Sequence, residues 1–229
     1  MKTPKTMSLT LRVLARLLSY PDAELRAHLN EMRQALRSEA ALAPARLAEV
    51  EALIASIGAQ SAIDAEADYV QLFDSGRRTS LHLFEHVHGD SRDRGPAMID
   101  LAQTFEKAGL HLAEGEMPDH LPVLLEYAST QPPREARALL AETAHILNVI
   151  FSALKQRRSR YASALGALIE LAGETAAPVQ LPDEEGIDDS WAEPAAFDGC
   201  SAAGQSRPGQ PQTIQIQRKP HGIAAGARP

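Results

Sequence analysis

The chain has almost no cysteine and few aromatic residues. The single cysteine, Cys200, excludes an internal disulfide and any site built from several thiolates, which fits a reducing cytoplasm. Aromatic residues make up only 4% of the 229 residues, whereas alanine and leucine are abundant. Because sheets select β-branched and aromatic residues, this composition favours helices. The sequence therefore predicts an all-α fold.

Positive charge is also scarce. The chain carries 23 Lys and Arg against 30 Asp and Glu, a formal net charge of −7, and binding to nucleic acid needs an excess of cations. We expect no stretch with the ~20 apolar residues that span a bilayer, and Arg12 and Arg16 interrupt the segment where a signal peptide would be unbroken. We therefore expect a soluble, cytoplasmic protein with no nucleic-acid partner and no integral membrane segment.

Apolar residues recur at helical spacing along most of the chain. This periodicity predicts helices over about residues 8–19, 25–36, 46–57, 64–73, 118–128, 134–156 and 161–173. A further helix is predicted to end at residue 109 and to begin somewhere between residues 91 and 95. After residue 174 the composition shifts to Pro, Gly, Gln and Ser with a small acidic cluster. We predict one helical-bundle domain over residues 7–173 and a largely disordered tail over residues 174–229, in which Trp191 and Phe197 could dock locally.

The stretch Ser80–Gly95 departs from this pattern. It combines three His, two Arg, three acids and two Gly with few apolar residues, a mixture that burial alone does not explain. Within it, His82, Glu85 and His86 fit the H-x-x-E-H pattern of zinc hydrolases. Such a site needs a third ligand, and Glu142 is the only candidate. A short pattern of this kind is weak support for a zinc enzyme, so this function remains an alternative.

Two further polar clusters have a structural and a functional interpretation. Arg92 and Arg94 alternate with Asp90 and Asp93 near a helix start, where an anion could bind or where ion pairs could fix the loop; the adjacent acids favour loop fixing. The pair Asp119 and His120 could act as acid and base, but no nucleophile motif accompanies it, which favours a capping aspartate.

Four segments taken together closely resemble the NarJ family, the delta-subunit assembly chaperones of respiratory nitrate reductase. They are Tyr69–Asp74, Ser80–Gly95, Ala97–Leu101 and Pro118–Tyr127. The resemblance covers roughly residues 9–173 and extends weakly to residues 191–194. The family belongs to the all-helical chaperones of molybdoenzymes. Two features depart from the family pattern, namely Pro96 and the Gly/Pro/Gln-rich end after Cys200.

The resemblance implies a chaperone and not an enzyme, with no metal or cofactor of its own. It would bind the N-terminal peptide of the immature alpha subunit of nitrate reductase, keep that subunit from docking too early on the membrane subunit, and keep it open for insertion of the molybdenum cofactor. Proteins of molybdenum-cofactor biosynthesis are further candidate partners.

A groove between helices would suit such an amphipathic peptide. We expect apolar residues to line it, acids at its rim to complement a basic peptide, and histidines at its rim to make affinity pH-sensitive. Leu81, Phe84 and Leu125 would form the lining, and Glu85, His86, Asp119 and His120 the rim. The complete set of predicted peptide-binding residues is Leu81, His82, Phe84, Glu85, His86, His88, Asp119, His120, Leu121, Leu125 and Tyr127.

Overall fold

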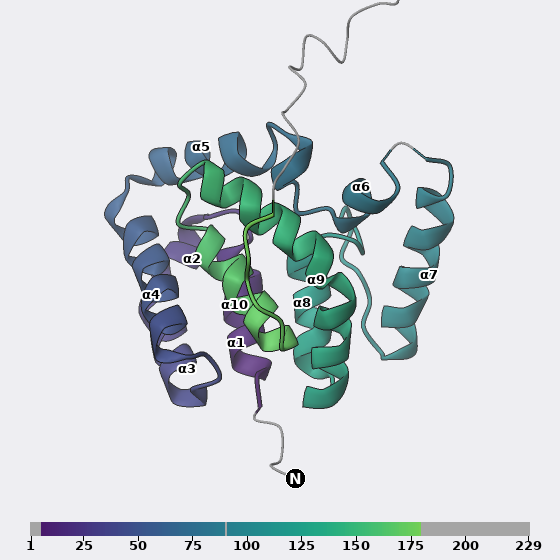
Figure 1. Ribbon diagram of the computed structural model, residues 1–229, viewed down its shortest axis with the longest axis horizontal. Coiled ribbons are helices and arrows are strands. Elements are labelled where there is room, and N and C mark those ends of the chain that lie inside the picture. Colours follow the sequence, from purple (N-terminus) through teal and green to yellow (C-terminus); the bar gives the residue numbers. More distant parts are fainter. Residues whose placement is uncertain (1–5, 90, 180–229) are drawn as a thin grey trace, which may run out of the picture. The chain divides into compact units, whose positions relative to one another are not determined.

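The computed structural model describes residues 6–89 and 91–179, all within one unit that spans Met1–Pro182. In this part of the chain the regular elements are helices, and the only extended pairing is an isolated bridge between His82 and His120 (Figure 1). The elements are α1 (Ser8–Leu17), α2 (Ala23–Ala27), α3 (Leu29–Glu39), α4 (Pro44–Ala59), α5 (Ala62–Phe73), the 3-10 turn η1 (Arg77–Thr79), α6 (Leu83–Val87), α7 (Arg94–Lys107), α8 (Leu121–Thr130), α9 (Pro133–Gln156) and α10 (Ala162–Ala172).

This architecture confirms the predicted all-α fold, and each predicted helix has a counterpart. The last helix ends at Gly173, whose φ of 93° is a left-handed conformation that favours glycine. Beyond it, the backbone N–H of Val179 donates to Ser152 Oγ over 2.9 Å. Residues 180–229, with Trp191, Phe197 and Cys200, lie outside the described residues, as does Asp90.

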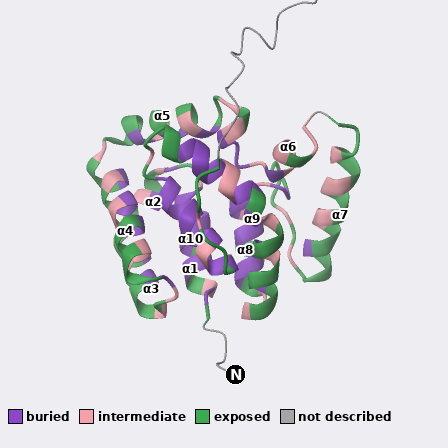
Figure 2. Ribbon diagram, in the orientation of Figure 1, coloured by how far each residue is buried: buried purple, intermediate pink, exposed green. Residues whose placement is uncertain are grey.

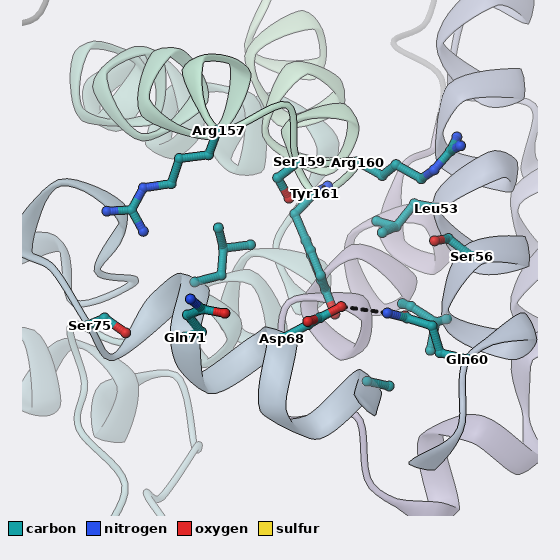
Figure 3. Close-up of a pocket in the computed structure, with 13 residues that line it drawn as sticks. Leu53, Ser56, Gln60, Asp68, Gln71, Ser75, Arg157, Ser159, Arg160 and Tyr161 are labelled. Carbon is teal, nitrogen blue, oxygen red and sulfur yellow. Dashed lines mark hydrogen bonds between the residues drawn. The ribbon is translucent and has the colours of Figure 1, made fainter. Parts of the chain in front are cut away.

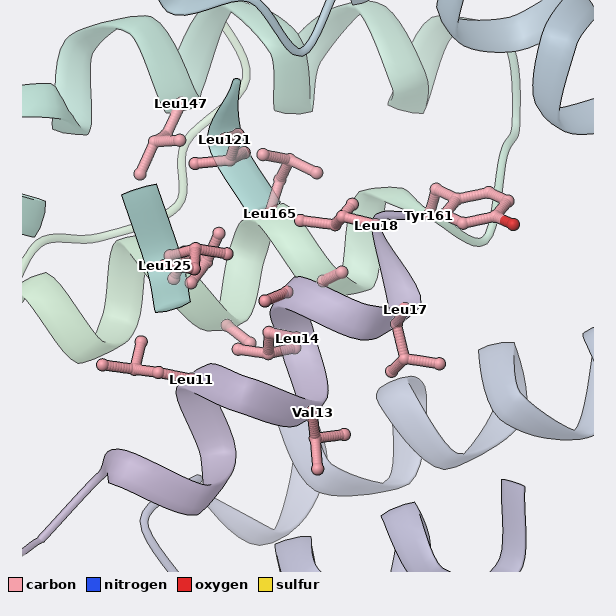
Figure 4. Close-up of a cluster of buried hydrophobic side chains, with 14 of the residues drawn as sticks. Leu11, Val13, Leu14, Leu17, Leu18, Leu121, Leu125, Leu147, Tyr161 and Leu165 are labelled. Carbon is pink, nitrogen blue, oxygen red and sulfur yellow. The ribbon is translucent and has the colours of Figure 1, made fainter. Parts of the chain in front are cut away.

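The core is centred on α10. Ten of its eleven residues are buried, and it packs along α9 and against α4 and α1. Leu11 and Leu14 of α1 belong to one buried cluster with Leu121 and Leu125 of α8 and Leu165 of α10 (Figure 4). Because α10 is rich in alanine and carries Gly166, neighbouring helices can approach it closely. A Cβ at Gly166 would lie 2.5 Å from the guanidinium of Arg46, which itself forms an ion pair with Glu170 at 2.8 Å.

Contrary to the sequence-based expectation, one helix is long and apolar enough to span a membrane. By length and composition α9 meets that criterion, and among the described helices it is the only one that does. Half of the apolar window is buried inside the protein. A central helix of a helical bundle has the same composition, because several of its faces contact neighbours. Its packing along α10 therefore accounts for its hydrophobicity.

Helices α6 and α7 stand apart from the bundle, and we call these two helices and the described residues between them the arm. The arm is mostly exposed, in contrast to the buried faces of α1, α8, α9 and α10 (Figure 2). Of the fourteen residues of α7, all of them described, only Phe105 is buried. Its ring packs on Tyr127 of α8, with ring centroids 4.7 Å apart. The arm is thus attached to the bundle through few apolar contacts.

Candidate functional site

Two segments that are distant in sequence join where the arm meets the bundle. The backbone N–H of Leu83 donates to the carbonyl oxygen of Asp119 at 3.0 Å, and the N–H of Leu121 donates to the carbonyl oxygen of Leu81 at 2.8 Å. These two bonds form the isolated bridge between His82 and His120. The first residues of α6 and α8 are therefore fixed side by side.

The carboxylate of Asp119 organises this junction. Asp119 is fully buried. Its Oδ2 accepts a hydrogen bond from the backbone N–H of Phe84 at 3.2 Å, and its Oδ1 lies 3.2 Å from Nδ1 of His82. Oδ2 is also 3.7 Å from the guanidinium of Arg94, which lies 3.5 Å from Glu85. We call Asp119, His82, Arg94 and Glu85 the Asp119 cluster.

The Asp119 cluster connects three elements through one buried charge. Asp119 precedes α8, the N–H that it accepts lies in the first turn of α6, and Arg94 begins α7. A carboxylate at this place satisfies a backbone donor that a helix start leaves unpaired. It also compensates the positive charge of Arg94. Since a buried carboxylate is stable only when it is paired and hydrogen-bonded, this cluster fixes the arm in one orientation.

The pKa values of the two histidines of the bridge are shifted in opposite directions. The hydrogen bond to Asp119 raises the pKa of His82, against the effect of its burial. Burial, together with the neighbouring charge of His82, lowers the pKa of His120 to about 4. Their rings are stacked with centroids 4.9 Å apart. Because two adjacent imidazolium ions would repel each other, His82, beside the carboxylate, is the first of the two to gain a proton as pH falls.

The structure divides the predicted peptide-binding residues into two groups. Four of them are buried, which corrects the expectation that they line or rim a groove: Leu81, Asp119, Leu121 and Leu125. The leucines belong to the bundle core, and Asp119 faces inward because the donors of α6 lie there. The other seven are partly exposed and remain accessible: His82, Phe84, Glu85, His86, His88, His120 and Tyr127.

The accessible residues do not line a single groove. His82 and Glu85 border a hollow of about 410 Å³ beside the turn that follows α5. Tyr127 borders a different hollow of about 390 Å³ between α8 and the end of α7. The second hollow has a mainly apolar wall and a rim with charges of both signs. The wall contains Phe105, Leu110, Leu112, Val123 and Tyr127, and the rim contains Arg12, His111, Glu116 and Glu126.

Sequence reasoning missed most of the second hollow. His111 was not among the predicted site residues, and it lies in the loop that follows α7. The sequence does contain a signal in Leu110 and Leu112, two leucines in a segment that begins at Gly109 and has no helical periodicity. Both leucines are partly buried against the core. Apolar residues in a loop indicate a place where that loop covers another element.

Arg94, one of the charged residues predicted to fix the loop before α7, has a structural role with partners that were not expected. Arg94 pairs with Glu85 and Asp119, and among the described residues no ion pair joins it to Asp93 beside it in sequence. The N–H of Asp93 donates to Ser91 Oγ, and Ser91 Oγ donates to the Asp93 carboxylate at 3.3 Å. Arg92 is exposed.

The zinc pattern does not form a convergent donor set. His82 precedes α6 and directs Nδ1 to Asp119, whereas Nε2 of His86 donates to the carbonyl oxygen of Ser80 at 2.9 Å. Glu142 is exposed on α9. Among the residues that the structure describes, no group of three or more His, Cys, Asp or Glu could hold a metal ion. The two histidines of the H-x-x-E-H pattern therefore make contacts that hold the helix and the adjoining loop.

The fold has a counterpart among solved structures. A solved structure from Archaeoglobus fulgidus, described as a redox enzyme maturation protein, aligns with 73% of this chain and 94% of its own, with a TM-score of 0.52 and 21% identity. At that identity the match shows the shared fold alone. The family follows from the sequence. The nitrate reductase delta subunit family model matches residues 19–166, and the chain belongs to this family.

Individual relatives agree with this assignment. The NarJ protein of Escherichia coli K12 is 44% identical over 162 residues, which cover 71% of this chain and 69% of the relative. The NarW protein of the same strain is 47% identical over 49% of each chain. The NarJ protein of Bacillus subtilis 168 is 32% identical over 70% of this chain and 86% of its own. All three are named nitrate reductase molybdenum cofactor assembly chaperones. The family consists of assembly chaperones and not of catalysts.

Proposed function

We propose that this chain is the dedicated assembly chaperone of a respiratory nitrate reductase. It binds the N-terminal peptide of the alpha subunit before the molybdenum cofactor is inserted, and prevents that subunit from docking on the membrane subunit too early. The cofactor is cargo destined for the alpha subunit, and proteins of its biosynthesis are further partners in the cytoplasm. The observation that carries the proposal is the 44% identity, over 71% of the chain, to a relative named as this kind of chaperone.

The junction of arm and bundle is the surface best suited to the peptide. An amphipathic helix binds by placing side chains from one face into an apolar depression. The hollow beside Tyr127 offers Phe105, Leu112 and Val123 for such side chains. Glu116 and Glu126 at its rim complement basic residues of the peptide. The hollow beside His82 and Glu85 is a second, separate surface at the start of α6.

The weak attachment of the arm supports a binding role. A few apolar contacts, those of Phe105 and Leu101, and one buried polar cluster hold α7, so its local stability is lower than that of the bundle. Binding segments are usually drawn from such regions, because they must adapt to a partner. The buried residues Leu81, Asp119, Leu121 and Leu125 position the accessible ones from beneath.

The proposal is tested by calorimetric titration of the full chain with the N-terminal peptide of the alpha subunit from the same organism. A peptide of about fifteen residues suffices for four helical turns. Saturable one-to-one binding by protein that elemental analysis shows to be free of zinc is the expected result. Absence of binding by folded protein would refute the peptide interaction, and stoichiometric zinc would favour the hydrolase.

The location is tested by Tyr127→Ala, with Ile63→Ala as the matched control. Tyr127 borders the hollow, whereas Ile63 is 78% exposed on α5. Loss of a central anchor costs about 1–3 kcal/mol of binding free energy, so Tyr127→Ala should weaken the peptide about 5- to 150-fold. Ile63→Ala should leave affinity unchanged. Equal affinity in both variants would place the peptide elsewhere without affecting the family assignment.

A further inference from the structure

A cluster of positive charge lies far from the arm in sequence, at the turn between α9 and α10. Lys155, Arg157, Arg158 and Arg160 are four cations within six residues, with no acid among residues 155–160. All four side chains are exposed. We call these four residues the basic corner. In a chain with a net charge of −7, such a concentration of cations creates a local field opposite in sign to that of the whole molecule.

Few of these charges are neutralised within the protein. In the described part of the chain, Lys155, Arg158 and Arg160 form no ion pair. The neighbouring Arg46 differs, because it pairs with Glu49 and Glu170. Lys155, Arg158 and Arg160 are therefore available to an external anion, whereas Arg46 serves the fold.

The basic corner separates two hollows. The larger, about 770 Å³, lies between α4, α5 and the corner, and the smaller is about 440 Å³. Both are bordered by Ser159 and Arg160, so they adjoin at the corner. In Figure 3, Arg157 and Arg160 extend from the corner in different directions, while Tyr161 points between them toward Asp68. A ligand that reaches both hollows must pass along the cations.

The walls of the larger hollow are apolar at depth and polar at the edge. Leu53, Ile57 and Leu72 provide apolar surface, and Tyr161 is buried beside them. The acid among the lining residues is Asp68, which accepts a hydrogen bond from Gln60. A volume of this size accepts several side chains of a partner. The hollow thus combines apolar burial with cationic neighbours.

We propose that the basic corner and its two hollows form a docking site for an acidic polypeptide segment of a partner protein. Carboxylates of the segment contact Lys155, Arg158 and Arg160, and apolar side chains between them enter the larger hollow. This surface is additional to the one proposed for the alpha-subunit peptide, and its charge is of the opposite sign. Charge complementarity favours a polypeptide over nucleic acid, because the net charge of −7 repels a long polyphosphate.

The test uses fluorescence anisotropy of the full chain with a labelled peptide of glutamate and leucine at helical spacing. A peptide with lysine in place of glutamate is the matched probe. The double variant Lys155→Glu with Arg160→Glu should weaken the acidic peptide at least about tenfold. Gln71→Trp, an exposed residue at the larger hollow, should weaken it by narrowing the space for leucine side chains. Both variants should retain the circular dichroism spectrum of the parent.

Arg134→Glu is the control, since it reverses one cation, as each half of the double variant does, at an exposed position at the other end of α9. It should change affinity for the acidic peptide less than about twofold. Three results would overturn the proposal: an equal loss in Arg134→Glu, equal binding of the lysine peptide, or tighter binding of a DNA duplex or of phosphatidylglycerol vesicles. The alpha-subunit peptide should bind the double variant normally, which separates this test from that of the proposed function.

Discussion

The bundle and the arm are stabilised by different forces. In the bundle, α10 buries ten of its eleven residues among leucines of α1, α8 and α9. In the arm, α7 buries one residue of fourteen and depends on the Asp119 cluster for its orientation. Apolar burial is additive and without direction, whereas a buried charge with three partners defines one geometry. The bundle therefore sets the global stability, and the arm sets the shape of the candidate site.

This difference has a consequence for a chaperone. A binding element that is attached by a small polar cluster can change position while the bundle stays folded. The hollow beside Tyr127 lies between the two regions, because Phe105 belongs to the arm and Tyr127 to the bundle. Movement of the arm alters that hollow directly. The substitutions below address the two regions separately.

The largest effect is expected from Leu165→Ala in the bundle. Leu165 is fully buried on α10, and a cavity at such a site costs about 2–5 kcal/mol of unfolding free energy. Chemical denaturation monitored by circular dichroism measures this loss. Ile99→Ala is the control in the arm, where Ile99 is 59% exposed, and should change stability by less than about 0.5 kcal/mol. Comparable losses in the two variants would show that the arm contributes to the global core.

A smaller and local effect is expected from Asp119→Asn. An amide cannot compensate the charges of Arg94 and His82, so the cluster loses about 1–3 kcal/mol. Because the cluster fixes the arm, hydrogen exchange should accelerate in α6 and α7 while α9 and α10 keep their protection. Glu85→Gln removes the partly exposed partner of Arg94 and should have a weaker effect. Uniform acceleration throughout the chain would mean that the junction is part of the global folding unit.

The helices of the bundle could be predicted from the sequence because the pattern that defines each helix lies within that helix. Leucines at three- and four-residue spacing predict both the helices and their buried faces, and the structure contains them. The end of α10 at Gly173 was predicted in the same way, because glycine adopts the left-handed conformation found there.

The candidate site was less predictable because it depends on pairing between distant segments. Polar residues such as Asp119 are expected at the surface, and only the bridge between His82 and His120 turns this carboxylate toward donors in α6. Two partners of Arg94, Glu85 and Asp119, were missed for the same reason, since a sequence reveals its neighbouring acids but not those brought close by folding. The resemblance to a known family pointed to these segments, but not to which of their side chains face solvent.

The smallest effect concerns pH and the two stacked histidines. The pKa of His120 is about 4 in the folded protein against an ordinary 6.5. The contribution of His120 to the stability of the folded protein is therefore complete above pH 6.5 and is lost as the pH falls toward 4. The contribution of His82 to stability depends on pH in the opposite direction. Its raised pKa gives a contribution that is complete below 6.5 and is lost as pH rises through its folded pKa.

Together the two histidines predict that the arm is most stable near pH 6.5. Hydrogen exchange of α6 amides, corrected for the intrinsic rate, should show a loss of about 1 kcal/mol by about pH 5 after allowance for solvent screening. In His120→Phe the ring still stacks on His82 but cannot titrate, so the acidic loss should diminish. Amides of α9 serve as the internal control. If α6 and α9 responded alike to acid, protonation of His120 would destabilise the whole domain, and the separation between arm and bundle would not extend to their electrostatics.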